Sequence, residues 1–206
     1  IVDDDHVSLS NLQRQIAHTT ERVGDAKTAS AAEMLGALNP DVRVVAHNVR
    51  VGPDNVAALI ADYDVVADGS DNFPTRFLLN DACHLGGKTL VSAAVLRFDG
   101  QLSTFKSYLG GVHPCYRCIY PAPPPEGLIS SCAEGGVLGA LAGTMGTLQA
   151  TEVIKEVLGI GESLSGTLMI YEGLAAAFRK VRVKPDPACA LCGAQPTIKT
   201  VVAHAA

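Results

Sequence analysis

Apolar and polar segments alternate along the first half of the chain, and this alternation predicts strands and helices in turn. The chain opens on Ile1-Val2 followed by three Asp, which is typical of a strand that ends in a loop. A helix is expected from Asp25, as its N-cap, to Asn39-Pro40, because apolar residues recur there at helical spacing (Ala29, Ala32, Leu35 and Leu38). The elements expected next are a strand over 42–49, a short helix from about residue 53, a strand over 63–67, a helix over about 75–85 and a strand over 89–95. This order favours a parallel sheet with helices on both faces.

The pattern changes after Phe98. Residues 101–108 are expected to form a strand that is reached through an Asp99-Gly100 turn. The elements expected after it are a helix over about 137–158, with Gly139, Gly143 and Gly146 allowing close backbone approach, and an antiparallel pair of strands over 167–171 and 178–184. The predicted fold is therefore an α/β, Rossmann-like, doubly wound sheet, parallel in its first half and mixed or antiparallel toward the C-terminus.

Length and composition narrow the class of protein. The 206 residues suit a single domain over 1–206 with a loose tail at 194–206, and a 48% hydrophobic content is enough for a packed core. The net charge of −5, without a basic run, argues against a nucleic-acid groove. The uncharged stretch between Glu134 and Glu152 is rich in Gly and Thr, so we expect a buried helix rather than a membrane span. Without a basic signal segment at the N-terminus, the expected location is cytoplasmic.

Two cysteine pairs give the strongest local signal. Cys115-x-x-Cys118 and Cys189-x-x-Cys192 have the spacing of a tetrahedral zinc site in which each pair chelates from a tight turn. Four thiolates leave no open coordination position, so such a four-cysteine zinc knuckle is structural rather than catalytic. A pair of disulfides and two separate redox motifs are the alternatives.

Two cations are candidates for binding phosphate. Lys27 falls in the first turn of the expected helix, where a cation faces the positive end of the helix dipole and a bound phosphate would compensate. Arg14, in the polar stretch Ser10-Asn11-Leu12-Gln13-Arg14-Gln15, has a guanidinium fork that suits bidentate phosphate contacts. A solvated surface lysine is the alternative at position 27.

Acidic side chains follow two of the expected strands. Asp3 or Asp5 stands where doubly wound folds place a carboxylate on a ribose hydroxyl, although solvated turn charges explain the same pattern. Asp71-Asn72 lies just beyond a buried strand, where ligands bind to open α/β sheets, and Asp71 could hold magnesium. A helix N-cap at either residue is the alternative there.

Two further cysteines differ in their surroundings. Cys83 lies in an apolar helix and is expected to pack in the core. Cys132 closes the Pro-rich loop 120–132, which is a candidate crossover, and it precedes the long helix. The helix dipole would lower the pKa of the Cys132 thiol there, so a nucleophile and a buried thiol are both open.

Taken together, these motifs resemble those of the ThiF/MoeB family, which are bacterial relatives of ubiquitin-activating enzymes. The resemblance covers about residues 1–193. It rests on Asp3-x-Asp5, on Val7-x-Leu9-Ser10-Asn11-Leu12-Gln13-Arg14-Gln15, on Gly24-x-x-Lys27, on Asp71-Asn72, on both cysteine pairs, and on Cys132-Ala-Glu-Gly-Gly-Val-Leu-Gly.

The family resemblance implies a magnesium- and ATP-dependent adenylyltransferase. Its substrate would be the C-terminal Gly-Gly carboxylate of a ubiquitin-like sulfur-carrier protein, in the molybdopterin, thiamine or cysteine pathway. A homodimer is implied, together with a separate sulfurtransferase, since a rhodanese domain does not follow the second cysteine pair.

The resemblance also implies roles for individual residues. Asp3 matches the ribose ligand, Lys27 the phosphate-binding lysine, Asp71 the magnesium ligand, and Cys132 the position at which some members link covalently to the carrier. The implied catalytic residues are Arg14, Lys27, Asp71 and Cys132, and the implied nucleotide-binding residues are Asp3, Asp5, Ser10, Asn11, Leu12, Gln13, Arg14, Lys27, Asp71 and Asn72.

Two other functions compete with adenylylation. Family members carry an upstream glycine-rich loop and an arginine that reaches the partner's site, and we expect these to be missing here, so the chain could be weakly active or inactive. A non-catalytic, zinc-stabilised docking module for the carrier is then one alternative. An NAD-dependent dehydrogenase is the other, because an acid after a strand also suits a nicotinamide dinucleotide.

Overall fold

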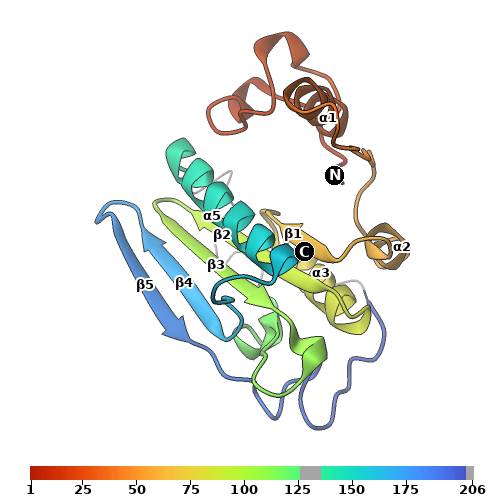
Figure 1. Ribbon diagram of the computed structural model, residues 1–206, viewed down its shortest axis with the longest axis vertical. Coiled ribbons are helices and arrows are strands. Elements are labelled where there is room, and N and C mark those ends of the chain that lie inside the picture. Colours follow the sequence, from red (N-terminus) through yellow and green to blue (C-terminus); the bar gives the residue numbers. More distant parts are fainter. Residues whose placement is uncertain (126–135, 203–206) are drawn as a thin grey trace. The chain divides into compact units, whose positions relative to one another are not determined.

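The computed structural model describes residues 1–125 and 136–202 (Figure 1). The chain divides into two compact units, and each is described by itself. The first unit is Ile1–Val51 and the second is Gly52–Ala206.

The first unit holds two 3-10 turns, Leu9–Asn11 and Thr20–Arg22, and the helix α1 (Lys27–Leu38). Helix α1 begins one residue later than the sequence pattern suggests, and Ala26 rather than Asp25 occupies the N-cap. The backbone of Asp25 is used instead by Val7, whose N–H donates to the Asp25 carbonyl at 2.8 Å. The expected end at Asn39 is confirmed, since Asn39 is the C-cap.

The apolar residues that predict α1 do not lie on the buried side of the helix in its own unit. Leu35 and Leu38 are exposed, whereas Thr28 and Ser30 are buried. The buried side is polar because Ser30 accepts a hydrogen bond from Arg22 Nη1 on its carbonyl at 3.1 Å and shares one with His18 Nδ1 on its hydroxyl at 2.8 Å. Hydrogen bonds to Ser30 therefore attach α1 to the preceding segment of its own unit.

The strand expected over 42–49 is also absent from the structure. This segment makes one isolated parallel bridge, between Val2 and His47. The carbonyl of His47 accepts from Asp3 N–H at 3.2 Å, and its N–H donates to the Ile1 carbonyl at 2.9 Å. A strand requires a ladder of such pairs, and the pairing here stops after the first three residues of the chain.

The second unit is built on a five-stranded sheet with the order β1-β2-β3-β4-β5. Its elements are α2 (Val56–Ile60), β1 (Val65–Asp68), α3 (Phe73–Leu85), β2 (Thr89–Leu96), β3 (Asp99–Phe105), α5 (Gly139–Leu158), β4 (Thr167–Glu172) and β5 (Ala177–Arg182). Strands β1 and β2 are parallel, and every later pair is antiparallel. This confirms the expected mixed α/β sheet.

The turn between β2 and β3 lies before the position that the sequence suggested. Asp99 and Gly100 are already paired with Leu96 and Val95, so the turn is made by Arg97 and Phe98. Arg97 has a φ of 54°, in the left-handed region that a tight hairpin connection requires. The Asp99-Gly100 pair therefore begins the strand instead of turning it.

Helices α3 and α5 cover opposite faces of the sheet. Val91 and Ala93 of β2 pack in a cluster with Leu141 and Met145 of α5, whereas the intervening Ser92 contacts α3. Successive side chains of a strand point to opposite faces, which places the two helices on the two sides of β2. This is the expected arrangement of a doubly wound fold.

Close approach of α5 to the sheet depends on a glycine in the strand, not in the helix. A Cβ atom at Gly100 of β3 would overlap the Met145 side chain, whereas one at Gly143 or Gly146 would meet no atom within 4 Å. The role expected for the helix glycines is therefore wrong at these two positions. Among the described residues, none of the helices combines the length and the apolar character that crossing a membrane would require.

Candidate functional site

The first unit brings Asp5 and Lys27 together. Lys27 Nζ donates to Asp5 Oδ2 at 2.7 Å, and the Lys27 backbone N–H donates to the Asp5 carbonyl at 2.9 Å. The Asp5 side chain is 70% exposed and that of Lys27 only 12%. The hydrogen bond and the charge of Lys27 lower the pKa of Asp5 below its ordinary value. The Lys27 side chain, at the first residue of α1, is therefore mostly buried and is paired with an exposed carboxylate.

Asp3 lies beside this pair. Its Oδ1 accepts from the Asp5 backbone N–H at 2.8 Å, and the carboxylates of Asp3, Asp4 and Asp5 approach within 4.8 Å of one another. The sequence placed Asp3 and Asp5 at the end of a first strand, and the structure places them beside the N-terminus of α1. They could accept hydrogen bonds from hydroxyl groups there.

The polar stretch after Val7 forms a compact turn beside α1. Ser8 N–H donates to Asn11 Oδ1 at 3.0 Å, and Arg14 Nη1 donates to the Ser10 carbonyl at 3.2 Å. Asn11 is buried, Arg14 is half-buried, and Ser10 and Gln13 are exposed, while Leu12 is half-buried. Hydrogen bonds within the turn therefore fix its backbone, and polar side chains lie at its surface.

Backbone pairing connects this turn to Lys27. Val7 pairs with two consecutive residues just before α1, since its carbonyl accepts from Gly24 N–H at 2.9 Å and its N–H donates to the Asp25 carbonyl. His6 and Ala26 form an antiparallel bridge next to it. Because Val7 is 2% exposed, the apolar anchor between the acidic residues and the polar turn is buried. Asp5 and Lys27 therefore meet at the N-terminus of α1, and Val7 connects the start of the polar turn to the residues just before the helix.

The second unit places Asp71 and Asn72 just past the carboxyl end of β1, as the sequence suggested. Asn72 is the N-cap of α3, and its Oδ1 accepts from Thr75 N–H at 2.9 Å. The N-cap alternative for Asn72 is therefore confirmed. Asp71 is exposed, and the hydrogen bond recorded for its carboxylate is a long one of 3.5 Å from Asn72 Nδ2. A carboxylate so placed has oxygen lone pairs available for a cation.

Sequence reasoning missed a buried polar network directly beneath Asp71. Asp68, the last residue of β1, is 2% exposed, and Arg76 of α3 is 8% exposed. Arg76 Nη1 donates to Asp68 Oδ2 at 3.4 Å and to the Ala93 carbonyl at 2.9 Å. The available signal was a lone arginine within the otherwise apolar start of α3, which follows a strand that ends in aspartate.

The four cysteines of the two pairs meet in one cluster of the second unit. The Sγ atom of Cys115 lies 3.9 Å from that of Cys118, 3.5 Å from that of Cys189 and 3.4 Å from that of Cys192, and the Sγ atoms of Cys118 and Cys192 are 3.4 Å apart. These separations are too long for disulfides, so that alternative is wrong. A tetrahedron of sulfurs about 2.3 Å from a central zinc has edges of about 3.8 Å, which the cluster fits closely.

The cluster is anchored to α3. Tyr116 N–H donates to Asn80 Oδ1 at 2.8 Å, and Arg117 donates to both oxygens of Asp81 at 2.8 Å each. On the other side, Ile198 packs against the cysteines, and its N–H donates to the Ala190 carbonyl at 2.9 Å. Residues up to 198 of the tail that was expected to be loose therefore take part in the fold around the cluster.

Of the two remaining cysteines, Cys83 lies in the described part of the chain and Cys132 does not. Cys83 is buried, and burial raises the pKa of its thiol to about 12, which agrees with a packing role. Cys132 lies outside the residues that the structure describes.

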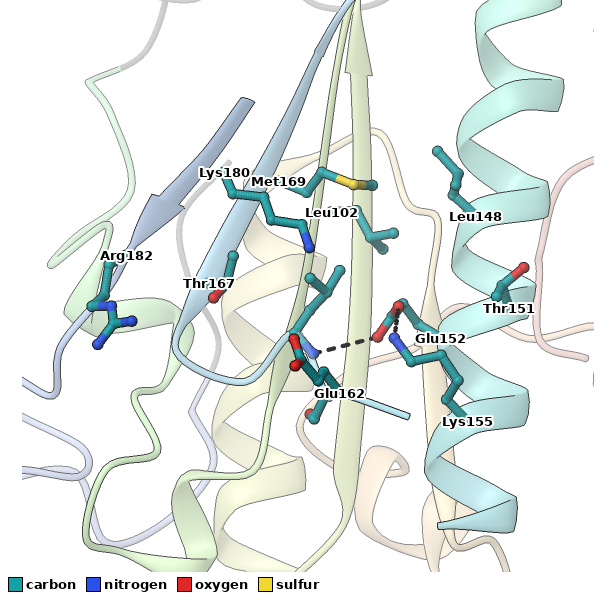
Figure 2. Close-up of a pocket in the computed structure, with 12 residues that line it drawn as sticks. Leu102, Leu148, Thr151, Glu152, Lys155, Glu162, Thr167, Met169, Lys180 and Arg182 are labelled. Atoms are coloured by element: carbon teal, nitrogen blue, oxygen red, sulfur yellow. Dashed lines mark hydrogen bonds and ion pairs between the residues drawn. The ribbon is translucent and has the colours of Figure 1, made fainter. Parts of the chain in front are cut away.

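A cavity of about 390 Å³ lies between α5 and strands β3 to β5 (Figure 2). Its charged lining residues are Glu152, Lys155, Glu162, Lys180 and Arg182. Glu152 is buried, pairs with Lys155, and accepts from Leu164 N–H at 3.4 Å. The hydrogen bond from Leu164 to Glu152 attaches α5 to the segment before β4. The site residues expected from the sequence are not among those that line this cavity.

Comparisons with known proteins agree with the motifs. The ThiF family profile matches residues 1–191. The "Sulfur carrier protein adenylyltransferase" of Thermus thermophilus is 48% identical over 208 residues, which is all of this chain and 77% of that protein. The "Adenylyltransferase and sulfurtransferase MOCS3" of Mus musculus is 47% identical over 199 residues, 96% of this chain and 43% of that protein.

Solved structures support the fold. A crystal structure of Escherichia coli MccB with MccA-N7isoASN matches with a TM-score of 0.79 at 17% identity, over 93% of this chain and 59% of that one. MccB with ATP matches with a TM-score of 0.77 at 16% identity, over 93% and 58%. This chain thus spans somewhat more than half of those proteins and less than half of the mouse relative.

Proposed function

The chain belongs to the ThiF family, and from this premise we propose that it adenylylates the C-terminal Gly-Gly carboxylate of a ubiquitin-like sulfur-carrier protein, using ATP and magnesium. The observation that carries the proposal is the pairing of Asp5 with Lys27 at the N-terminus of α1, in a chain whose relatives are named adenylyltransferases. Sulfur transfer to the activated carrier would follow, in molybdopterin, thiamine or cysteine biosynthesis.

The reaction needs negative charge to be neutralised as it moves between phosphates. A carboxylate oxygen of the carrier attacks the α-phosphorus of ATP, the bond from that phosphorus to the oxygen bridging to the β-phosphate breaks, and pyrophosphate leaves with the electron pair. An acyl-adenylate remains. Such chemistry depends on positioning and on electrostatic stabilisation rather than on covalent help from the protein.

Lys27 and Arg14 are the cations that we assign to the phosphates. The N-terminus of α1 adds backbone N–H groups with partial positive charge at the same place. Because Asp5 is exposed and Lys27 is mostly buried, a phosphate can compete with Asp5 for the Lys27 ammonium without moving the lysine far. Asn11, Ser10, Leu12 and Gln13 would line the nucleotide, and Asp3 would accept from the ribose hydroxyls.

Asp71 is the residue that we assign to magnesium, and Asn72 supports it by fixing the start of α3. Magnesium is held in phosphate sites by one or two carboxylates together with the phosphates themselves. The exposed, loosely engaged carboxylate of Asp71 fits that requirement. When bound, the ion would neutralise charge on the leaving pyrophosphate.

Three further assignments complete the proposal. The four-cysteine cluster would hold zinc in a structural role, because four thiolates fill a tetrahedral site. Cys132 would form a covalent link to the carrier, with a separate sulfurtransferase as sulfur source. The protein would act in the cytoplasm as a homodimer.

The docking module is the second candidate, and the exposed edge strand β5, at which a partner strand could add, is the feature that favours it. The NAD-dependent dehydrogenase is not favoured, since the relatives are named adenylyltransferases.

ATP–pyrophosphate exchange tests the proposal. With zinc-loaded protein, magnesium and a Gly-Gly-tailed carrier, we expect exchange that depends on all three components. Lys27→Ala should lower its rate about 100-fold, as for other removals of a preorganised charge-stabilising group, while the exposed Lys184→Ala should leave it unchanged. Carrier binding without exchange would instead identify a docking module.

A further inference from the structure

We propose that Arg76, together with Asp68 and Gln149, is a positioning group that fixes the turn 69–72 and so aims the Asp71 carboxylate. This inference rests on the proposed function, in which Asp71 holds the magnesium ion. None of the three side chains was expected from the sequence to have a role in the site.

Ser70 is held from three directions by this network. Its N–H and its hydroxyl both donate to Asp68 Oδ1, at 2.9 and 2.7 Å, and its carbonyl accepts from Arg76 Nη2. The residue before Asp71 thus has its donors and its acceptor satisfied by buried charges. Hydrogen bonds to charged groups are the stronger class, so Ser70 is a fixed point.

The residue after Asp71 is fixed as well, because Asn72 caps α3. Asp71 therefore stands between two immobilised neighbours, while its own carboxylate accepts one long hydrogen bond from Asn72. A carboxylate whose neighbouring residues are fixed, and whose oxygens accept only a long hydrogen bond from the described residues, is preorganised for a ligand. Preorganisation lowers the cost of forming the bound geometry.

Arg76 connects the turn to the sheet. Its guanidinium spans the end of β1 at Asp68, the turn at Ser70, and β2 at the Ser92 hydroxyl and the Ala93 carbonyl. The Ser92 hydroxyl in turn donates to Asp68 Oδ2 at 2.8 Å. A lysine could not reach these acceptors together, because only arginine presents a rigid fork of several donors.

Gln149 fixes the same edge from the opposite face of the sheet. Its Nε2 donates to the carbonyls of Asp68 at 2.8 Å and of Val91 at 2.9 Å. The end of β1 is thus held by α3 on one face and by α5 on the other. A displacement of either helix would be transmitted to Asp71 through Asp68.

The arrangement predicts that changes at Arg76 alter metal binding at Asp71. If Arg76 acts through Asp71, Arg76→Lys should weaken Mn²⁺ binding in the presence of a non-hydrolysable ATP analogue about tenfold, as measured by electron paramagnetic resonance. It should raise the magnesium concentration for half-maximal pyrophosphate exchange by a similar factor. Ser92→Ala, which removes one donor to Asp68, should give a smaller change of about threefold. The exposed Arg179→Lys is the matched control.

A double-mutant cycle separates positioning from a general loss of stability. Arg76→Lys should have little further effect on Mn²⁺ affinity in an Asp71→Asn background, because the carboxylate that it aims is gone. Additive effects of the two changes would overturn the proposal. So would an Arg76→Lys protein that melts earlier but binds Mn²⁺ as the wild type does.

Amide hydrogen exchange gives a readout that does not depend on activity. The Ser70 and Asp71 amides should lose protection in Arg76→Lys and keep it in Arg179→Lys. A wild-type protein that binds no Mn²⁺–nucleotide would contradict the proposed function. In that case loop protection decides the positioning role by itself, and unchanged protection in Arg76→Lys would overturn it.

Discussion

Each unit contains a salt bridge with a similar N–O distance, and the two salt bridges differ in how exposed they are. Asp5 and Lys27 of the first unit meet at 2.7 Å with the acid 70% exposed. Asp81 and Arg117 of the second unit meet through two hydrogen bonds of 2.8 Å, and the Asp81 side chain is 0% exposed. The same chemistry thus serves two purposes. An exposed pair can be opened by an anionic ligand, whereas a buried pair can only be broken at a cost.

The surroundings of the buried pair explain its purpose. The Arg117 guanidinium lies 4.7 Å from the centre of the Phe77 ring, and the arginine stands between the two cysteines of the first pair. The salt bridge therefore fixes the first cysteine pair to α3, while the second pair comes from the far end of the unit. The comparison teaches that exposure, rather than the presence of opposite charges, distinguishes the pair that we propose to open for a ligand from the one that holds the structure together.

Removing the zinc that we propose for the cysteine cluster should have the largest effect, and on the second unit alone. Structural zinc in small sites contributes on the order of 10 kcal/mol, so Cys189→Ser should abolish stoichiometric zinc and lower Tm by more than about ten degrees. Metal analysis and thermal melting measure both. Cys83→Ala, outside the cluster, should keep the zinc. Full zinc content and an unchanged Tm in Cys189→Ser would contradict the assignment.

Breaking the buried pair should come next. Arg117→Leu leaves the Asp81 carboxylate buried without its main cation, and losses of this kind cost about 3–5 kcal/mol in the free energy of unfolding. Arg179→Leu breaks the exposed pair with Glu172, recorded at 3.7 Å, and should cost no more than about 1 kcal/mol. Urea unfolding of the zinc-loaded proteins compares the two. Equal losses would remove the distinction drawn between buried and exposed pairs.

The exposed pair of the first unit should give the smallest effect, and one that depends on pH. Lys27 lowers the pKa of Asp5 from its ordinary value of 3.8. The contribution to stability is then present above that value and is lost as the pH falls through the lower folded-state pKa. Because Asp5 is mostly exposed, it amounts to less than about 1 kcal/mol. The difference in unfolding free energy between wild type and Asp5→Asn should shrink on acidification, and a difference independent of pH would exclude this pairing as its source.

Local patterns predicted the second unit well. The strand and helix order and the cap at Asn72 depend on patterns within short segments, and the structure confirms both. The meeting of the two cysteine pairs, which their matching C-x-x-C spacing predicted, is confirmed as well. The roles of Asp3, Lys27 and Asp71 remain predictions. Lys27 at a helix start and Asp71 after a strand end lie where the sequence suggested, whereas Asp3 follows an isolated bridge at Val2 instead of a strand.

The errors arise where an element depends on neighbours that a local pattern does not contain. Residues 42–49 have strand-forming composition but find a pairing partner at His47 only. Leu35 and Leu38 repeat at helical spacing, yet the buried side of α1 is decided by the hydrogen bonds of Ser30. Arg76 was missed because a single charge in a helix gives no sign of whether it points to solvent or to a buried aspartate.

The separation of the cysteine pairs along the chain has a consequence for how the protein folds. Cys115 and Cys189 are 74 residues apart, and α5, β4 and β5 lie between them. Closing a loop of that size lowers the entropy of the chain before any contact stabilises it, so contacts between distant residues form slowly. We therefore expect all four thiols to meet only after the intervening elements have docked. The rate at which the refolding protein binds zinc would then report the rate at which the second unit assembles. It should be slower than diffusion of the ion, and substitutions far from the cysteines should change it.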